Sequence, residues 1–175
     1  MATINPTALQ AAVRDEQTVT PEGESVRPSI DGVAVRRGRT VVDERGTITE
    51  MLSATWAFTQ EPIVYAYQTT IRPGVVKGWI VHLTSVDRLF FASGSARLVL
   101  FDAREDSATA GLVEELFFDP ANRGVVRIPC GVFHAVQNIG VDDAVFVNFP
   151  TEPYAHEDPD KYRLPLDTES IPFRF

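Results

Sequence analysis

After residue 35, no segment of the chain carries an apolar stripe of helical spacing long enough to connect two parallel strands. Short runs rich in β-branched and aromatic residues follow one another instead, separated by turn sequences such as Arg45-Gly46 and Pro73-Gly74. Because parallel strands need long crossovers, about ten strands without intervening helices predict an all-β antiparallel sandwich or closed barrel. The expected strands cover residues 33–35, 40–42, 47–51, 63–71, 75–83, 88–92, 96–101, 113–118, 125–128, 133–138 and 144–149.

Both ends of the chain differ from this pattern. Residues 1–30 are rich in Thr, Glu, Pro and Ser, and we expect an N-terminal arm there that is either flexible or packed against a partner subunit. Asn5 followed by Pro6 predicts a short helix with Asn5 as its N-cap. Residues 151–175 contain four prolines and are expected to form an extended tail over the surface. Residues 31–175 then form a single domain.

The charge and cysteine content exclude several classes of partner. Sixteen basic and twenty-four acidic residues give a net charge of −8, which argues against nucleic acid as a ligand. Cys130 is the only cysteine, and Arg14, Asp15 and Glu16 interrupt any secretory signal, so we expect a cytoplasmic protein. No apolar run approaches the roughly 20 residues that span a bilayer, so no membrane is expected either.

Two of the three histidines lie in spaced motifs. The first motif has Ile80-Val81-His82 at its centre, and the second has His134 shortly after a Pro-Cys-Gly turn. Residues i and i+2 of a strand point to the same face, so Ile80 and His82 both enter a barrel and His134 meets them from a neighbouring strand. The two motifs resemble those of the cupin superfamily, which predicts a jelly-roll barrel. They comprise Gly74, Ile80, His82, Asp87 and Gly94, and then Gly124, Pro129, Gly131, His134 and Asn138.

Metal-binding cupins use both histidines of the first motif, its carboxylate and the histidine of the second motif. Here Ile80 replaces the first histidine, so the resemblance implies no metal cofactor, with a three-ligand divalent metal site at His82, Asp87 and His134 as the alternative. Other readings also remain open. Either histidine can be a hydrogen-bonded core residue, and Asp87 can form a structural ion pair with Arg88.

A longer set of segments in fixed order resembles the dTDP-4-dehydrorhamnose 3,5-epimerase family, over roughly residues 40 to 175. The resemblance implies an isomerase that acts on a nucleotide-linked 4-keto-6-deoxysugar as a homodimer. The matching segments are Asp43-Glu44-Arg45-Gly46, Glu50, Gln68, residues 73–79, residues 128–134 and residues 165–172.

The resemblance also assigns roles to individual residues. The family's catalytic base falls on Ile80 and its tyrosine acid on Asn148, so His82 is the nearest substitute for the base, and Tyr65, Tyr67 or Tyr154 for the acid. Trp79 is expected outside the barrel or at a dimer interface. The implied catalytic residues are His82, His134, Lys77 and Asp167, the last of which orients the base. The implied substrate-binding residues are Arg45, Glu50, Gln68 and Tyr154.

These assignments support one leading hypothesis and one from another class. Epimerisation beside a ketone needs a base, a group that holds the enolate oxygen and an acid on the opposite face. The leading hypothesis is such an epimerase or keto-isomerase, with His82 as the base. The alternative is a catalytically lapsed relative that binds a sugar nucleotide or another small ligand, and its evidence is Ile80 and Asn148.

Overall fold

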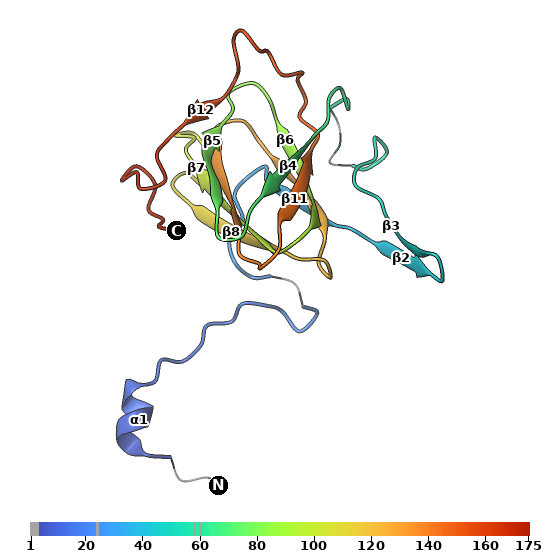
Figure 1. Cartoon of the computed structure of the whole chain (residues 1–175). Coiled ribbons are helices and arrows are strands. Elements are labelled where there is room, and N and C mark those ends of the chain that lie inside the picture. Colours follow the sequence, from blue (N-terminus) through green and yellow to red (C-terminus); the bar gives the residue numbers. More distant parts are fainter. Residues whose placement is uncertain (1–3, 24, 58, 60) are drawn as a thin grey trace.

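The computed structural model describes residues 4–23, 25–57, 59 and 61–175, and it contains two five-stranded antiparallel sheets (Figure 1). The first sheet has the strand order β1-β9-β6-β11-β4, and the second has the order β12-β5-β10-β7-β8. This arrangement confirms the predicted jelly roll. The strands are β1 (Ala34–Arg37), β2 (Thr40–Asp43), β3 (Gly46–Thr49), β4 (Tyr67–Ile71), β5 (Val76–Val81), β6 (Asp87–Ser93), β7 (Ala96–Asp102), β8 (Val113–Phe118), β9 (Gly124–Ile128), β10 (Val132–Asn138), β11 (Ala144–Asn148) and β12 (Tyr162–Arg163).

Within the described part of the chain, strands β2 and β3 pair only with each other and form a hairpin that projects from the barrel (Figure 1). The N-terminal arm also leaves the barrel, and its helix α1 (Pro6–Ala11) has no buried residue. Asn5 caps this helix as predicted, since its side-chain oxygen accepts from the backbone N–H of Thr7 at 2.9 Å. Residues 1–3 and 24 of the predicted arm lie outside the described residues. Ile30, at the predicted boundary, is already buried in the core.

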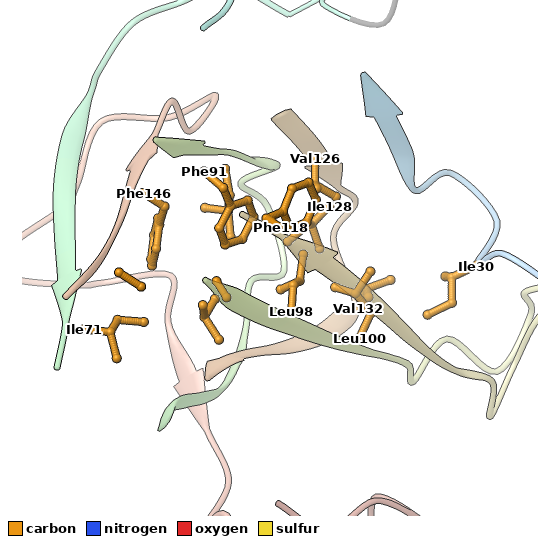
Figure 2. Close-up of a cluster of buried hydrophobic side chains, with 14 residues drawn as sticks. Ile30, Ile71, Phe91, Leu98, Leu100, Phe118, Val126, Ile128, Val132 and Phe146 are labelled. Atoms are coloured by element: carbon orange, nitrogen blue, oxygen red, sulfur yellow. The ribbon is translucent and has the colours of Figure 1, made fainter. Parts of the chain in front are cut away.

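The main core lies between the two sheets, because alternate side chains of facing strands point inward. Phe91 of β6 stacks on Phe118 of β8 with ring centroids 4.2 Å apart, and Phe146 of β11 packs beside Phe91 (Figure 2). Leu98 and Leu100 of β7 are fully buried in the same cluster. This core fills one part of the space between the sheets and leaves the part beside β4 and β5 for a cavity.

A second, smaller core lies on the outer face of the second sheet. Trp79 of β5 is fully buried there, and the rings of Phe173 and Phe175 pack on it with centroids 6.2 and 5.3 Å away. The expectation that Trp79 faces out of the barrel is therefore confirmed, and the C-terminal tail of the same chain covers it. Because the tail is held at this point, the segment between β11 and the tail has to cross the end of the barrel.

Arg88 of β6 is fully buried on the outer face of the first sheet and forms no ion pair with Asp87. Its guanidinium donates to the backbone carbonyls of Glu61, Pro62 and Phe149 at 2.7–2.9 Å. These bonds fix the loop that leads into β4. The alternative in which Asp87 forms an ion pair with Arg88 is therefore excluded, because neighbouring residues of a strand point to opposite faces.

No helix in these described ranges is long and apolar enough to cross a membrane.

Candidate active site

Strand β5 carries a bulge that turns several of its side chains toward the interior. His134 of β10 pairs with Ile80 and Val136 pairs with Lys77, so β5 has one more residue between these pairs than β10 has. At the bulge a Cβ on Gly78 would lie 2.2 Å from the Cβ of Ala135, so only glycine fits. Bulges commonly redirect side chains at functional sites. Here the bulge allows Lys77 to line the same cavity as Ile80.

At one end of the barrel, His82, Asp87 and His134 converge. The Nε2 atoms of His82 and His134 lie 3.4 and 3.2 Å from the same carboxylate oxygen of Asp87. The two rings are stacked with centroids 5.8 Å apart. The structure therefore brings together both predicted histidines and the predicted carboxylate, which come from three different strands or strand ends.

The carboxylate of Asp87 is almost fully buried and is held by three donors. Its second oxygen accepts from the side-chain amide of Asn148 at 2.7 Å. Burial raises the pKa of Asp87, but the hydrogen bonds from His134 and His82 outweigh it and hold that pKa well below its usual range. Asp87 is thus ionised, and its charge helps to raise the pKa of His82.

Asn148 also places a tyrosine in the site. Its amide donates to the hydroxyl oxygen of Tyr67 at 2.9 Å, and its side-chain oxygen accepts from the backbone N–H of Arg88. Burial and the charge of Asp87 raise the pKa of Tyr67, so the phenol remains protonated at neutral pH. Of the three tyrosines considered as substitutes for the missing acid, Tyr67 is the one that lines both cavities of the site.

Both ring nitrogens of His82 face acceptors. Nδ1 donates to the backbone carbonyl of Asp160, and Nε2 faces Asp87. Burial lowers the pKa of His82, but the hydrogen bond and charge of Asp87 and the carbonyl of Asp160 outweigh burial and raise it above its ordinary value. His82 is therefore arranged as a proton donor. This geometry differs from the predicted role of His82 as the base.

The partner of His82 belongs to residues 150–163, which we call the strap because they cross the end of the barrel (Figure 1). The carboxylate of Asp160 accepts from the backbone N–H groups of Leu83, Thr84 and Ser85 at 2.8–2.9 Å. Burial raises the pKa of Asp160, but these bonds outweigh it and lower the pKa to about 2. Strand β12 begins two residues after Asp160. It pairs with β5 and so closes the strap onto the second sheet.

Two adjoining cavities meet at this end of the barrel. One, of about 290 Å³, lies between β4 and β5 and is lined by Lys77, Ile80 and Arg163 among others. The other, of about 310 Å³, lies under the strap and is lined by Tyr65 and Tyr154 among others. Volumes of this size suit small-molecule ligands. The residues that line both cavities, and so mark their junction, are Tyr67, His82, Asp87 and Lys161.

The remaining predicted residues divide into two groups. Lys77 and Tyr154 line the cavities, whereas Gln68 is exposed on the outer side of β4 and lines neither of them. Asp167 is also exposed and lines neither cavity, and the groups that hold His82 are Asp160 and Asp87 instead.

Arg45 and Glu50 lie at the β2–β3 hairpin, outside both cavities. The Arg45 side chain is 81% exposed and pairs with Asp43 at 2.5 Å. The structure therefore does not bring these two residues to the histidines of their own chain.

Two site residues, Asp160 and Lys161, were not predicted from the sequence. They lie in a proline-rich segment that carries no strand pattern. Asp160 accepts hydrogen bonds from residues about 75 positions earlier in the chain, such as the backbone N–H of Ser85. A pattern within a short window contains no signal for such contacts.

The residues of the predicted alternative metal site fit a divalent ion. One ligand atom from each of His82, Asp87 and His134 lies within 4.8 Å of the others. The bond from Nδ1 of His82 to a backbone carbonyl is also the support that metal-ligating histidines usually have. Two imidazoles and one carboxylate suit several transition metals.

Comparisons with known proteins agree with this fold. Residues 41–162 match the family model described as the polysaccharide biosynthesis C-terminal domain. A probable low-salt glycan biosynthesis epimerase of Haloferax volcanii is 33% identical over 141 residues, which cover 80% of this chain and 90% of that protein. A spore coat polysaccharide biosynthesis protein of Bacillus subtilis is 33% identical over 146 residues, covering 83% of this chain and 96% of that one.

Among solved structures, a dTDP sugar isomerase from Desulfovibrio desulfuricans superposes with a TM-score of 0.77 at 26% identity, over 82% of this chain and 90% of that one. A 3'-monoepimerase from Streptomyces bikiniensis, in complex with dTDP-quinovose, superposes with a TM-score of 0.71 at 22% identity, over 80% of this chain and 73% of that one.

The fold and the site thus define a cupin of the sugar-nucleotide epimerase type, and the resemblance found in the sequence is confirmed. More specifically, the chain belongs to the polysaccharide biosynthesis C-terminal domain family.

Proposed function

We propose that the protein is an isomerase of glycan biosynthesis that moves a proton at a carbon beside the ketone of a nucleotide-linked 4-keto-6-deoxysugar. The observation that carries this proposal is the convergence of His82, Asp87 and His134 with Tyr67 at the junction of two cavities. The Haloferax relative is named an epimerase and the Desulfovibrio neighbour a dTDP sugar isomerase, which supports the same class of reaction.

The chemistry follows from the charge state of the cluster. When the proton leaves carbon, negative charge develops on the ketone oxygen, and preorganised donors stabilise that charge best. The N–H groups of His82 are already bonded to Asp87 and to the carbonyl of Asp160, so protonated His82 acts through its positive charge, and Lys77 adds a second positive charge at the cavity wall. Tyr67 supplies a proton from the first sheet. Asp87 orients the imidazoles, a role that the family resemblance implied for Asp167.

The test is hydrogen exchange in deuterated water with dTDP-4-keto-6-deoxyglucose as the probe. We expect the wild-type protein to incorporate deuterium at a carbon next to the ketone, detected by NMR or mass spectrometry. His82→Gln is expected to lose at least about 100-fold in rate. His156→Gln is the matched control, because His156 is exposed and lines neither cavity. Tight binding of the probe without any exchange would instead identify the lapsed relative.

A metal-dependent variant of the function is the second candidate, favoured by the three converging ligand atoms of His82, Asp87 and His134. A bound divalent ion would supply a Lewis acid for the ketone oxygen. Metal analysis of protein purified without chelator distinguishes the two. About one equivalent of metal that disappears in Asp87→Ala supports the metal site, whereas undiminished exchange in metal-free protein excludes a catalytic role for it.

We also propose that the protein forms a homodimer through the β2–β3 hairpin. An isolated two-stranded hairpin is only marginally stable in water, and this one exposes Val41, Val42 and Ile48 to 58%, 70% and 70%. In such a dimer, Arg45 and Glu50 of one copy would lie near a cavity of the other, as their predicted substrate-binding role requires. Light scattering should give a dimer for the wild type and a monomer for Val42→Asp. A dimeric Val42→Asp variant would contradict this interface.

A cytoplasmic location remains part of the proposal. Cys130, the only cysteine, is a free thiol in the turn before β10, and nucleotide sugars are the expected substrates.

A further inference from the structure

At the junction of the two cavities, the residues described so far do not include a group that is free to act as the base. Ile80, where the resembled family places its base, is apolar. His82 donates from Nδ1 and faces a carboxylate with Nε2, and Asp87 accepts from three side chains. Each of these groups, and also His134 with its Nε2 on Asp87, is engaged in a hydrogen bond or ion pair, which leaves the proton from carbon to a further side chain.

Lys161 is the uncommitted group at this junction. It lines both cavities and is half-buried, and its ammonium forms no hydrogen bond or ion pair with the residues the structure describes. The other two cations of the site differ from it. Arg163 cannot lose its proton at physiological pH. Lys77 is more exposed than Lys161 and lines only the cavity between β4 and β5.

The backbone on both sides of Lys161 is fixed. Before it, the carboxylate and the carbonyl of Asp160 are bonded to the 83–85 turn and to His82. After it, Tyr162 and Arg163 pair with Val81 and Ile80 of β5. A lysine without a function needs no such support, whereas catalytic groups depend on rigid placement.

We infer that Lys161 is the catalytic base of the isomerisation, an inference that rests on the proposed function. Lys161 enters from the second sheet and the strap, and Tyr67 enters from β4 at the edge of the first sheet. A sugar held between them has one group on each face. This is the arrangement that inversion at a carbon requires.

The electrostatic surroundings of Lys161 agree with this role. Burial and the neighbouring charges of Arg163 and Lys77 lower the pKa of Lys161, while Asp87 opposes that change. The neutral amine, which is the form that accepts a proton, is therefore easier to reach than in an exposed lysine. The titratable and charged groups that line the two cavities beside Lys161 are Tyr65, Tyr67, Lys77, His82, Asp87, His134, Glu152, Tyr154, Asp158, Asp160 and Arg163.

The step balances without any oxidant or reductant. The C–H bond beside the ketone breaks, its proton moves to Nζ of Lys161, and its electron pair forms the C=C bond of the enolate. The positive charges of protonated His82 and of Lys77, which line the same cavity, stabilise the enolate oxygen. Tyr67 then delivers a proton to the opposite face of the carbon, and the ammonium of Lys161 and the phenolate of Tyr67 return to their starting states by exchange with water.

The experiment compares Lys161→Arg, Lys161→Met and Lys161→Ala with the wild type in deuterium exchange from dTDP-4-keto-6-deoxyglucose. Arginine retains the positive charge but cannot act as a base, so we expect both Lys161→Arg and Lys161→Met to lose at least about 100-fold in exchange rate. The affinity for dTDP, measured by calorimetry, should stay within about threefold in Lys161→Arg. Ethylamine should restore exchange to Lys161→Ala, with a rate that rises with pH, because a free amine replaces the missing base.

Three outcomes decide between the explanations. Exchange in Lys161→Arg within about threefold of the wild type overturns the base and leaves only a binding cation. Loss in every variant without rescue by amine also overturns it. Absence of exchange in the wild-type protein overturns the proposed function, and the role of Lys161 with it. Thermal unfolding of each variant, matched to the wild type, confirms that the comparison is made between folded proteins.

Discussion

Asp160→Asn should detach the strap from the barrel end without changing the size of the side chain. In the wild type one carboxylate accepts from three backbone N–H groups, those of Leu83, Thr84 and Ser85, and from the hydroxyl of Thr84 at 2.8 Å. An amide has one acceptor oxygen and presents an NH₂ group to the remaining donors. The substitution therefore removes the charge and at least one of the bonds.

The size of the effect follows from the pKa of Asp160. A fall from 3.8 to about 2 on folding corresponds to about 2.4 kcal/mol of stabilisation of the ionised form. Because the strap lies near the solvent, screening reduces this to about 1–1.5 kcal/mol. For a chain of this length, such a loss lowers the Tm by about 2–6 °C.

The pH dependence gives a second, independent measurement. The folded-state pKa lies below the unfolded one, so the stabilisation is fully present above about pH 4 and is lost as the pH falls through about 2. The difference in the free energy of unfolding between the wild type and Asp160→Asn should therefore be constant from pH 5 to 7 and shrink below pH 4. Urea unfolding at each pH measures it.

Native-state trypsin digestion reports the strap directly, because Lys161 and Arg163 are the cleavage sites that the strap carries. We expect faster cleavage there in Asp160→Asn. Glu157→Gln is the control, since Glu157 is exposed on the same strap and its side chain forms no hydrogen bond or ion pair with the described residues. Equal stability and equal cleavage in the wild type and Asp160→Asn would refute the reasoning.

Three further changes test other parts of the structure. Gly78→Ala places a Cβ 2.2 Å from that of Ala135 and should cost about 3 kcal/mol or prevent folding, with partial recovery in the double variant Gly78→Ala/Ala135→Gly, measured by urea unfolding. Trp79→Ala removes a fully buried side chain under the C-terminal tail and should cost about 3–5 kcal/mol in the same assay. Asp102→Asn weakens a buried carboxylate that accepts from Arg104, Ser107 and Thr109. It should lower the free energy of unfolding by about 1.5–3 kcal/mol at pH 7, and a loss below about 0.5 kcal/mol would contradict this.

The sequence predicted the barrel well because each strand has its own local signature. Period-two segments and glycine turns locate strands β1 to β11 within a few residues, and the asparagine before Pro6 correctly marks the start of α1. The inward direction of His82 and His134 follows from the same alternation. These features depend on neighbours in the chain, which a single sequence displays.

The site was less predictable, because its remaining parts depend on contacts between distant segments. Strand β12 has only two residues and lies among prolines, and the bonds of Asp160 reach 75–77 positions back to the 83–85 turn. Residue-by-residue transfer from the resembled family placed the orienting carboxylate at Asp167, which the structure leaves exposed. Matching a residue to a family position assigns it a role. The match does not show where a tail without regular secondary structure lies in the folded chain.

The structure shows what Ile80 and Asn148 do at the two positions where this chain differs from the resembled family. Asn148 binds Asp87, the hydroxyl of Tyr67 and the backbone N–H of Arg88, so it positions a phenol on β4 at the site where the resembled family has one on β11. Ile80 is opposite His134 on one side and Arg163 on the other. The two proposed proton-transfer groups, Lys161 and Tyr67, thus enter from the edges of the two sheets. Because Asp160 holds both the 83–85 turn and Nδ1 of His82, a change in the strap is expected to alter the histidine cluster as well as the position of Lys161.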